Sequence, residues 1–301
     1  MKKLLLIFGI LVSMMGKGES QTVFNNRESR QFCAYNCLFN GVIAGIGSGV
    51  HHKKGEKFFH AAKNGFMKGL LSGACDFESK QILSNNVNQN KMVLNPTVFW
   101  GSKLLNAGGN SLLRAGTLNE KVKDNLYMEI GFLRISNRGV QIEPISFGCL
   151  IYNFVIGDKF DYKTSLICGT PIFTYGYNKL ISNDYEIYGY EMNMNISYYN
   201  KYIGNDIFMH EICHNYQTLS WENTSNLFKI YDKYENVGII HNDLSLYTLV
   251  YDCQNYNHNI FETEANWFAK ENNDVKDVTF ESIETGTHNP NTIPLIIPHH
   301  H

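Results

Sequence analysis

The sequence predicts an α+β protein with an N-terminal helical hairpin region, an antiparallel β meander and a C-terminal helical segment. Glycines recur every four residues in two apolar stretches near the N-terminus, and short runs near the middle alternate with a period of two. A His-Glu-Ile-Cys-His array at residues 210–214 lies in a helical pattern. We expect five regions, with boundaries at 1–20, 21–120, 121–202, 203–270 and 271–301.

The first twenty residues have the pattern of a secretory signal peptide. Two lysines precede an apolar run from residue 4 to residue 15, and small residues precede Gln21. A membrane anchor needs about 20 apolar residues, so cleavage before Gln21 is expected. The mature protein is therefore expected to be secreted or periplasmic, with association with the cell envelope as a variant of that location. The signal and the Asn-, Tyr-, Lys- and Ile-rich composition resemble those of exported bacterial proteins.

Composition bounds the class of protein. Hydrophobic residues make up 44% of the 301 residues and aromatic residues 13%, which is enough for a sizeable core. The formal net charge of -2 and the lack of a basic patch with interleaved aromatics argue against a nucleic-acid partner. The six cysteines outside the array either pair in an oxidising compartment or stay as buried thiols. The oligomeric state does not follow from these features.

The helical hairpin is predicted from glycine spacing. Glycines at 41, 45 and 49 and at 65, 69 and 73 lie in the apolar stretches 40–50 and 58–74. Such spacing gives each helix a flat face, so the two helices can approach closely around a turn near 51–55. A further helix is expected after Pro96. The hairpin is interpreted as soluble packing, with membrane-surface contact through residues 39–82 as the alternative.

The middle of the chain is predicted to form a meander of about five antiparallel strands. Alternating runs separated by Gly, Asn and Asp span residues 127–135, 140–145, 149–156 and 164–173. The Tyr-rich run 185–202 is expected to line a substrate groove or a ligand cavity. A closed lipocalin-like barrel is the competing arrangement.

The His-Glu-Ile-Cys-His array carries the chemistry. His210 and His214 are four residues apart, so they share one helix face and can bind one zinc ion. Glu211 projects elsewhere, where a carboxylate can accept the proton of a water that zinc activates. A second helical pattern over 261–269 supplies a third ligand, Glu262, with Asn266 on the same edge. Glu264 and His258 remain alternative third ligands.

The two motifs H-E-x-x-H and E-x-x-A-N together resemble those of the gluzincin zinc metallopeptidases. The likeness covers residues 203–269 and extends no further along the chain. The resemblance implies zinc as the cofactor, with His210, His214 and Glu262 as its three ligands. It also implies that Glu211 is the general base and that Asn266 steadies a ligand by hydrogen bonding. The sequence does not match the metzincin pattern, because that pattern requires Gly and His at the positions of Gln217 and Ser220.

The function expected from these motifs is that of a secreted zinc-dependent hydrolase, a metallopeptidase acting on a peptide or protein substrate. Gln217, one turn beyond His214, is expected to hydrogen-bond either substrate or a metal ligand. The residue that stabilises the transition state is left open among Tyr216, His241 and Tyr256. The alternative is a non-catalytic envelope or ligand-binding protein with a barrel-like sheet and a structural or degenerate H-E-x-x-H helix.

Overall fold

The structure, a computed structural model, describes most of the N-terminal two thirds of the chain and parts of the remainder. The described residues are 27–89, 95–137, 139–155, 157, 159–174, 188–189, 196–198, 205–227, 236–237, 240–241 and 259–269. Within them the protein is mostly helical with small β-sheets. The α+β class predicted from the sequence is therefore confirmed. The expected signal peptide at 1–20 and the expected tail at 271–301 lie outside the described residues.

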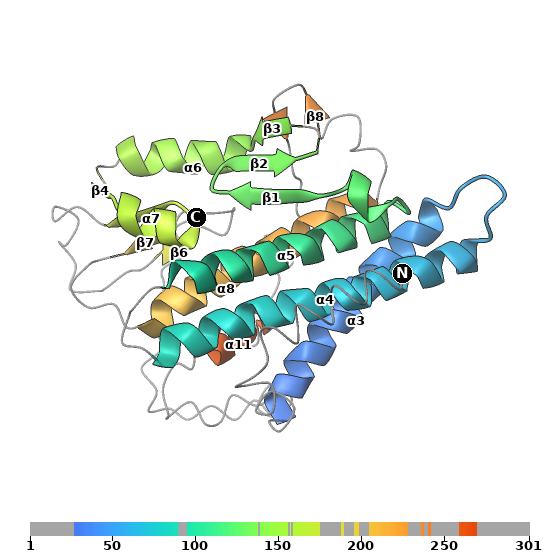
Figure 1. The fold of residues 1–301 in the computed structure, drawn as a ribbon, viewed down its shortest axis with the longest axis horizontal. Coiled ribbons are helices and arrows are strands. Elements are labelled where there is room, and N and C mark those ends of the chain that lie inside the picture. The colour runs from blue at the N-terminus through green and yellow to red at the C-terminus, as the bar shows by residue number, and fades with distance from the viewer. Residues whose placement is uncertain are drawn as a thin grey trace.

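Three long helices form the N-terminal part: α3 (Arg27–Val50), α4 (Phe58–Gln89) and α5 (Pro96–Thr117). Figure 1 shows α4 lying between α3 and α5. The α5 helix begins where the sequence predicts, because the Asn95 side chain accepts a hydrogen bond from the Thr97 amide and Pro96 occupies the first turn. The turn between α3 and α4 covers residues 51–57.

Glycine spacing is what lets α3 and α4 pack closely. A methyl group on Gly65 would overlap the carbonyl oxygen of Ala44, and one on Gly69 would overlap that of Asn40. The α4 backbone therefore lies directly against the α3 backbone at these positions. Larger side chains would force the two helices apart.

Replacing Gly69 with alanine is expected to lower the free energy of unfolding by about 2 kcal/mol or more, because the added methyl meets backbone atoms that cannot rotate away. Gly108→Ala in α5 is the matched control, since its added methyl meets nothing within 4 Å. There the substitution is expected to raise stability by roughly 0.5–1 kcal/mol. Urea denaturation of both variants measures the difference, and equal effects would contradict the close approach.

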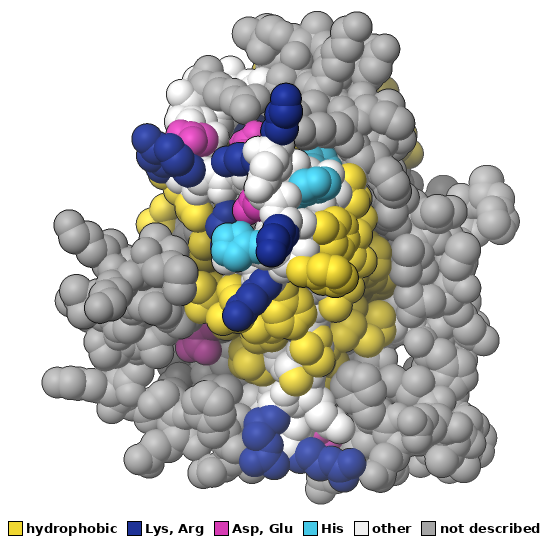
Figure 2. All heavy atoms as spheres, turned by 90° about the vertical axis from the view of Figure 1, so that its right-hand side faces the viewer, with side chains coloured by type: hydrophobic (Ala, Val, Ile, Leu, Met, Phe, Trp, Pro, Cys, Tyr) yellow, Lys and Arg dark blue, Asp and Glu magenta, His cyan; other side chains and the backbone are white. Residues whose placement is uncertain are grey.

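One helix of the described residues, α3, is long and apolar enough to cross a membrane by length and composition alone. It is also partly a core helix, since 44% of its most apolar window is buried inside the protein. The opposite side of α3 faces outward. Figure 2 shows hydrophobic side chains gathered on the face of the molecule where α3 and the start of α4 lie.

The first sheet contains the part of the meander that the sequence predicts. Its strands are β1 (Tyr127–Ile130), β2 (Leu133–Ser136), β3 (Gly139–Ile142), β9 (Ile240–His241) and β8 (Asn236–Val237), in that spatial order. Strands β1, β2 and β3 are antiparallel, whereas β9 runs parallel to β3. The sheet lies beside α5, on the side away from α3 (Figure 1).

The second sheet is smaller. It has the order β4 (Lys159–Phe160), β5 (Ile172–Thr174), β7 (Ile196–Tyr198) and β6 (Tyr188–Gly189). Strands β5 and β7 are parallel and the other two pairs antiparallel. Neither sheet closes on itself among the described strands, so these strands form no lipocalin-like barrel. Most of the Tyr-rich run 185–202 lies outside the described residues.

The strand predictions for two of the alternating runs are wrong. Residues 149–156 lie mainly in α6 (Pro144–Val155), and most of 164–173 lies in α7 (Tyr162–Cys168) followed by the short β5. Pro144 favours the start of a helix because it fixes a helical φ at a position whose amide has no helical partner. Asp161 caps α7 by accepting from the Thr164 amide at 3.0 Å, and Gly169 closes it with φ 64°. These local end signals outweigh the alternating pattern of short apolar runs.

The C-terminal part packs against the helical layer. The helix α8 (Asn205–Glu222) is followed by the 3-10 turn η3 (Asn223–Leu227), and α11 (Ile260–Ala269) lies against both α8 and α4. The six cysteines of the described residues are free thiols. The main core surrounds α8 and consists of Phe32, Phe77, Leu83, Phe99, Cys168, Ile172, Met209, Ile212, Cys213, Tyr216, Leu219, Ala265, Phe268 and Ala269.

Candidate metal centre

The two histidines of the motif lie on the buried helix α8. Every residue from Met209 to His214 is buried, so this stretch of the helix is enclosed on all sides rather than on one face. His210 and His214 are one turn apart, and their Nε2 atoms lie 2.9 Å from each other. The rings are nearly perpendicular, with centroids 4.6 Å apart. Both imidazoles therefore direct the same nitrogen toward one point.

The third side chain comes from the first turn of α11. Asn259 caps this helix, since its Oδ1 accepts from the Phe261 amide at 2.9 Å. Glu262 then points toward α8, with Oε2 3.2 Å from His210 Nε2 and Oε1 3.2 Å from His214 Nε2. The three ligand atoms all lie within 4.8 Å of one another. The structure thus brings together the three residues that the sequence proposes as ligands.

The spacing of these atoms fits a zinc ion. Ligand atoms about 2.0–2.2 Å from one tetrahedral ion lie roughly 3.3–3.6 Å apart. The two nitrogen–oxygen separations of 3.2 Å are close to that range, and the nitrogen–nitrogen separation of 2.9 Å needs only a small opening. Two imidazoles and one carboxylate are also the donor set of many catalytic zinc sites.

The electrostatics of the site favour a cation at this point. Burial alone would raise the pKa of Glu262, but the charges and hydrogen bonds of His214 and His210 outweigh it and hold that pKa well below its usual range. Burial alone would lower the pKa of His214, but Glu262 outweighs it and the pKa is raised. Glu211 is itself buried, and its charge also raises the pKa of His214. Two buried carboxylates, Glu262 and Glu211, therefore raise the pKa of His214.

Gln217 fixes which nitrogen of His214 carries the proton. The Gln217 Nε2 group donates to Phe261 O at 3.0 Å and to Glu264 Oε2 at 2.8 Å, which uses both of its hydrogens. Its Oε1 must then be the atom 2.8 Å from His214 Nδ1, and it can only accept. The neutral His214 ring therefore holds its proton on Nδ1 and keeps a lone pair on Nε2. This is the tautomer that a metal ligand needs.

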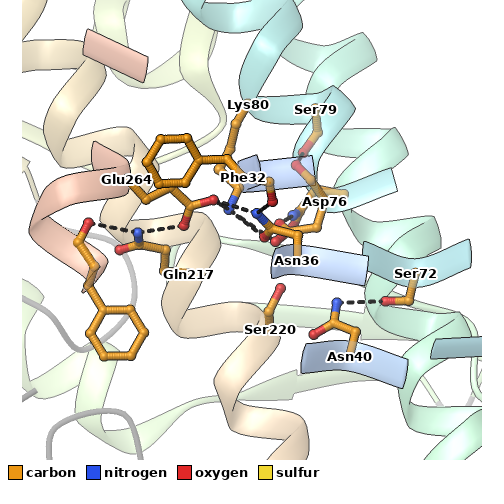
Figure 3. A network of polar contacts seen from close by, with 12 residues as sticks. Phe32, Asn36, Asn40, Ser72, Asp76, Ser79, Lys80, Gln217, Ser220 and Glu264 are labelled. Carbon is orange, nitrogen blue, oxygen red and sulfur yellow. Dashed lines mark hydrogen bonds and ion pairs between the residues drawn. The ribbon is translucent and has the colours of Figure 1, made fainter. Parts of the chain in front are cut away.

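Glu264, which the sequence leaves open as a third ligand, has a different role. Its Oε1 forms a 2.9 Å ion pair with Lys80 and accepts from Asn36, while its Oε2 holds Gln217. Lys80 is fully buried and also pairs with Asp76 at 3.1 Å. Figure 3 shows these side chains converging from α3, α4, α8 and α11. Glu264 therefore bonds to Gln217, the neighbour of His214, and is not one of the three converging residues.

The hydrogen-bonded network continues into α5 and returns to α8. Asp76 Oδ1 accepts from Asn106 at 2.9 Å, Asn106 Oδ1 accepts from Asn110 at 2.9 Å, and Asn110 Oδ1 lies 3.3 Å from Ser220 Oγ. All of these groups are buried. Sequence reasoning missed this network, although Asp76 and Lys80 have the four-residue spacing of a helical ion pair in an apolar stretch.

The other residues considered from the sequence are placed as follows. Asn266 is half-buried one turn after Glu262, and its steadying role stays a prediction. The Tyr216 hydroxyl lies 3.1 Å from Ser102 Oγ and the ring belongs to the core, so it is not among the groups that face the histidines. His258, Tyr256 and the side chain of His241 lie outside what the structure describes.

A second group of buried acids has a different character. Glu129, Glu143 and Glu222 also bring carboxylate oxygens within 4.8 Å of one another. The guanidinium of Arg134 lies 3.4 Å from Glu129 and 3.6 Å from Glu143 and stacks on Tyr127, 3.8 Å from the ring centroid. A buried cation from the protein itself therefore faces this group, and we interpret it as an ion-pair cluster.

Replacing Gln217 with methionine is expected to weaken zinc binding by about 10–100-fold, because His214 loses the acceptor that fixes its tautomer. Competition with a chromophoric chelator measures the dissociation constant. Gln81→Met is the matched control: Gln81 is another buried glutamine of the helical layer, bonded to Asn85 and not to a ligand. Equal affinities in wild type and Gln217→Met would show that the hydrogen bond does not support the ligand.

Comparison with known proteins gives no family for this chain. No family model, no curated protein and no solved structure matches it. Its function is therefore inferred from the geometry of the described residues.

Proposed function

We propose that this protein is a zinc-dependent hydrolase, most simply a metallopeptidase of the gluzincin type. The observation that supports the proposal is the convergence of His210, His214 and Glu262, from two separate helices, on one buried point. Three ligands of this kind leave a coordination position for water or substrate, as in catalytic zinc sites. Zinc bound here would supply a Lewis acid that polarises a carbonyl group and lowers the pKa of a water molecule.

Two further residues, Gln217 and Glu211, have roles in the proposed mechanism. His214 is kept in its metal-binding tautomer by Gln217, whose amide donates to Glu264. Glu264 is held in turn by its ion pair with Lys80. Glu211 lies between the two histidines in sequence, is buried with them, and is not one of the three converging ligands. We assign it the role of general base, which accepts a proton from the attacking water and passes it to the leaving amine.

Elemental mass spectrometry of the purified protein tests the metal site. We expect about one zinc per chain, and loss of zinc in Glu262→Gln, which keeps the size of the side chain but removes its charge. Glu78→Gln on α4 is the control, since Glu78 is outside the cluster. Removal of His299, His300 and His301 from all samples prevents zinc binding by the tail. Wild-type protein without zinc would overturn the proposal.

A metal site without catalysis is the remaining alternative. The non-catalytic binding protein considered from the sequence relied on a barrel-like sheet, and the described strands form two small open sheets. A zinc-loaded protein that hydrolyses neither unfolded protein nor a mixed fluorogenic peptide library would indicate a structural metal site.

A further inference from the structure

The outward row of α3 is apolar over most of the helix. The exposed residues after Arg30 recur every four positions, and all of them are apolar: Ala34, Leu38, Val42, Ile46 and Val50. The four large ones are each 48% to 58% exposed. A rise of 1.5 Å per residue makes this row about 24 Å long. The solvent-facing row of an ordinary surface helix is polar, so an exposed apolar row of this length indicates an interaction surface.

The row continues onto the beginning of α4. The Phe58 ring lies over Gly49, where a methyl group would overlap it, and it contacts Phe59 edge-on with centroids 5.3 Å apart. Phe59 is 83% exposed, and Met67 is exposed two turns further along. The turn therefore joins the apolar row of α3 to exposed aromatic side chains on α4. We call this surface the hairpin face: it consists of Ala34, Leu38, Val42, Ile46 and Val50 of α3 with Phe58, Phe59 and Met67.

Basic side chains lie at both ends of the hairpin face. Arg27 and Arg30 are exposed at one end, and His52, Lys53, Lys54, Lys57 and Lys63 are exposed at the other. Residues 27–63 contain six Lys or Arg and two Glu, in a chain whose formal net charge is -2. Figure 2 shows basic side chains above, below and among the hydrophobic side chains of this surface. Residues 27–63 therefore carry an excess of positive charge beside the apolar surface, although the chain as a whole is slightly acidic.

This combination fits an anionic membrane surface. A helix that lies in the interface buries an apolar row among acyl chains while Lys and Arg reach the headgroups. A second copy of this protein fits the face less well. A two-fold pairing of the hairpin faces would bring their positively charged ends together or leave those charges without an opposite charge. Spanning is also disfavoured, since the inner side of α3 carries Asn36 and Asn40, which are bonded to groups on α11 and α4.

We propose that the hairpin face docks the protein on membranes that contain anionic lipid, with α3 lying in the plane of the interface. This inference is independent of the metal centre, because none of the residues involved contacts a proposed ligand. It places the hydrolase at a lipid surface without assigning a role to the lipid in the reaction.

Tryptophan fluorescence locates the contact on the full chain. Ile46→Trp is expected to shift its emission to the blue and to be quenched by brominated lipids in vesicles of phosphatidylcholine mixed with phosphatidylglycerol. Leu104→Trp is the matched control, since Leu104 is a 59% exposed leucine on α5 outside the hairpin face. Absence of quenching at Ile46, or equal quenching at both positions, would overturn the proposal.

Vesicle flotation then measures affinity. Ile46→Asp is expected to weaken binding to the mixed vesicles at least about 10-fold, because an aspartate cannot enter the acyl region, while Leu104→Asp leaves it unchanged. Changing Lys53, Lys54 and Lys57 to Glu is expected to abolish the preference over pure phosphatidylcholine, whereas the same change at Lys121, Lys123 and Lys163 is not. A dimer that Ile46→Asp separates, with unchanged flotation, would assign the face to self-association instead.

Discussion

Glu211→Gln is expected to lower peptide hydrolysis by about 10²–10⁴-fold while zinc stays bound at about one ion per chain. The amide keeps the size of the side chain but cannot accept a proton. Glu211 is not one of the three converging ligands, so the affinity for the metal is expected to change little. Activity is measured as kcat/KM on a peptide substrate, with zinc content determined on the same samples.

The pairing of these two measurements separates the roles of neighbouring residues. Glu262→Gln is expected to lose both zinc and activity, whereas Glu211→Gln loses activity alone. Glu78→Gln is the control that loses neither. Full hydrolysis by zinc-loaded Glu211→Gln would remove the general base from the mechanism, although the metal site would still stand.

Lys80→Met is expected to cost about 3–5 kcal/mol of unfolding free energy, the largest loss of stability that we predict. Lys80 is fully buried between Asp76 and Glu264, 3.1 and 2.9 Å away. Burial alone would lower the pKa of Lys80, but the two carboxylates outweigh it and raise that pKa, so the lysine is charged. Burial also raises the pKa of Asp76 to about 6, and without Lys80 its charge would lack this partner.

A second substitution distinguishes charge from packing. Lys80→Met combined with Glu264→Gln is expected to recover part of the loss, because one of the stranded carboxylates becomes neutral. Lys63→Met on the exposed side of α4 is the control and is expected to change stability by less than about 0.5 kcal/mol. Chemical denaturation in the absence of zinc measures all three. A loss in Lys80→Met no larger than in Lys63→Met would mean that the buried ion pairs contribute little.

Local sequence patterns predicted a large part of the helical structure. Glycines four residues apart predicted the close hairpin of α3 and α4, and the start of α5 at Pro96 followed from residue types that act within one turn. The same reasoning failed over 149–156 and 164–173, where short apolar runs fit a strand or a helix equally well. There Pro144, Asp161 and Gly169 decided for helices.

The sequence by itself determined the types of the proposed ligands, because two histidines one helical turn apart and a carboxylate in a second helical pattern can be read directly from it. Only the tertiary structure decided which carboxylate meets them. Glu262 and Glu264 are two residues apart on α11, so they point in different directions, one to the histidines and one to Lys80. That choice depends on how α11 packs between α8 and α4, and contacts between residues so distant in the chain leave no local pattern.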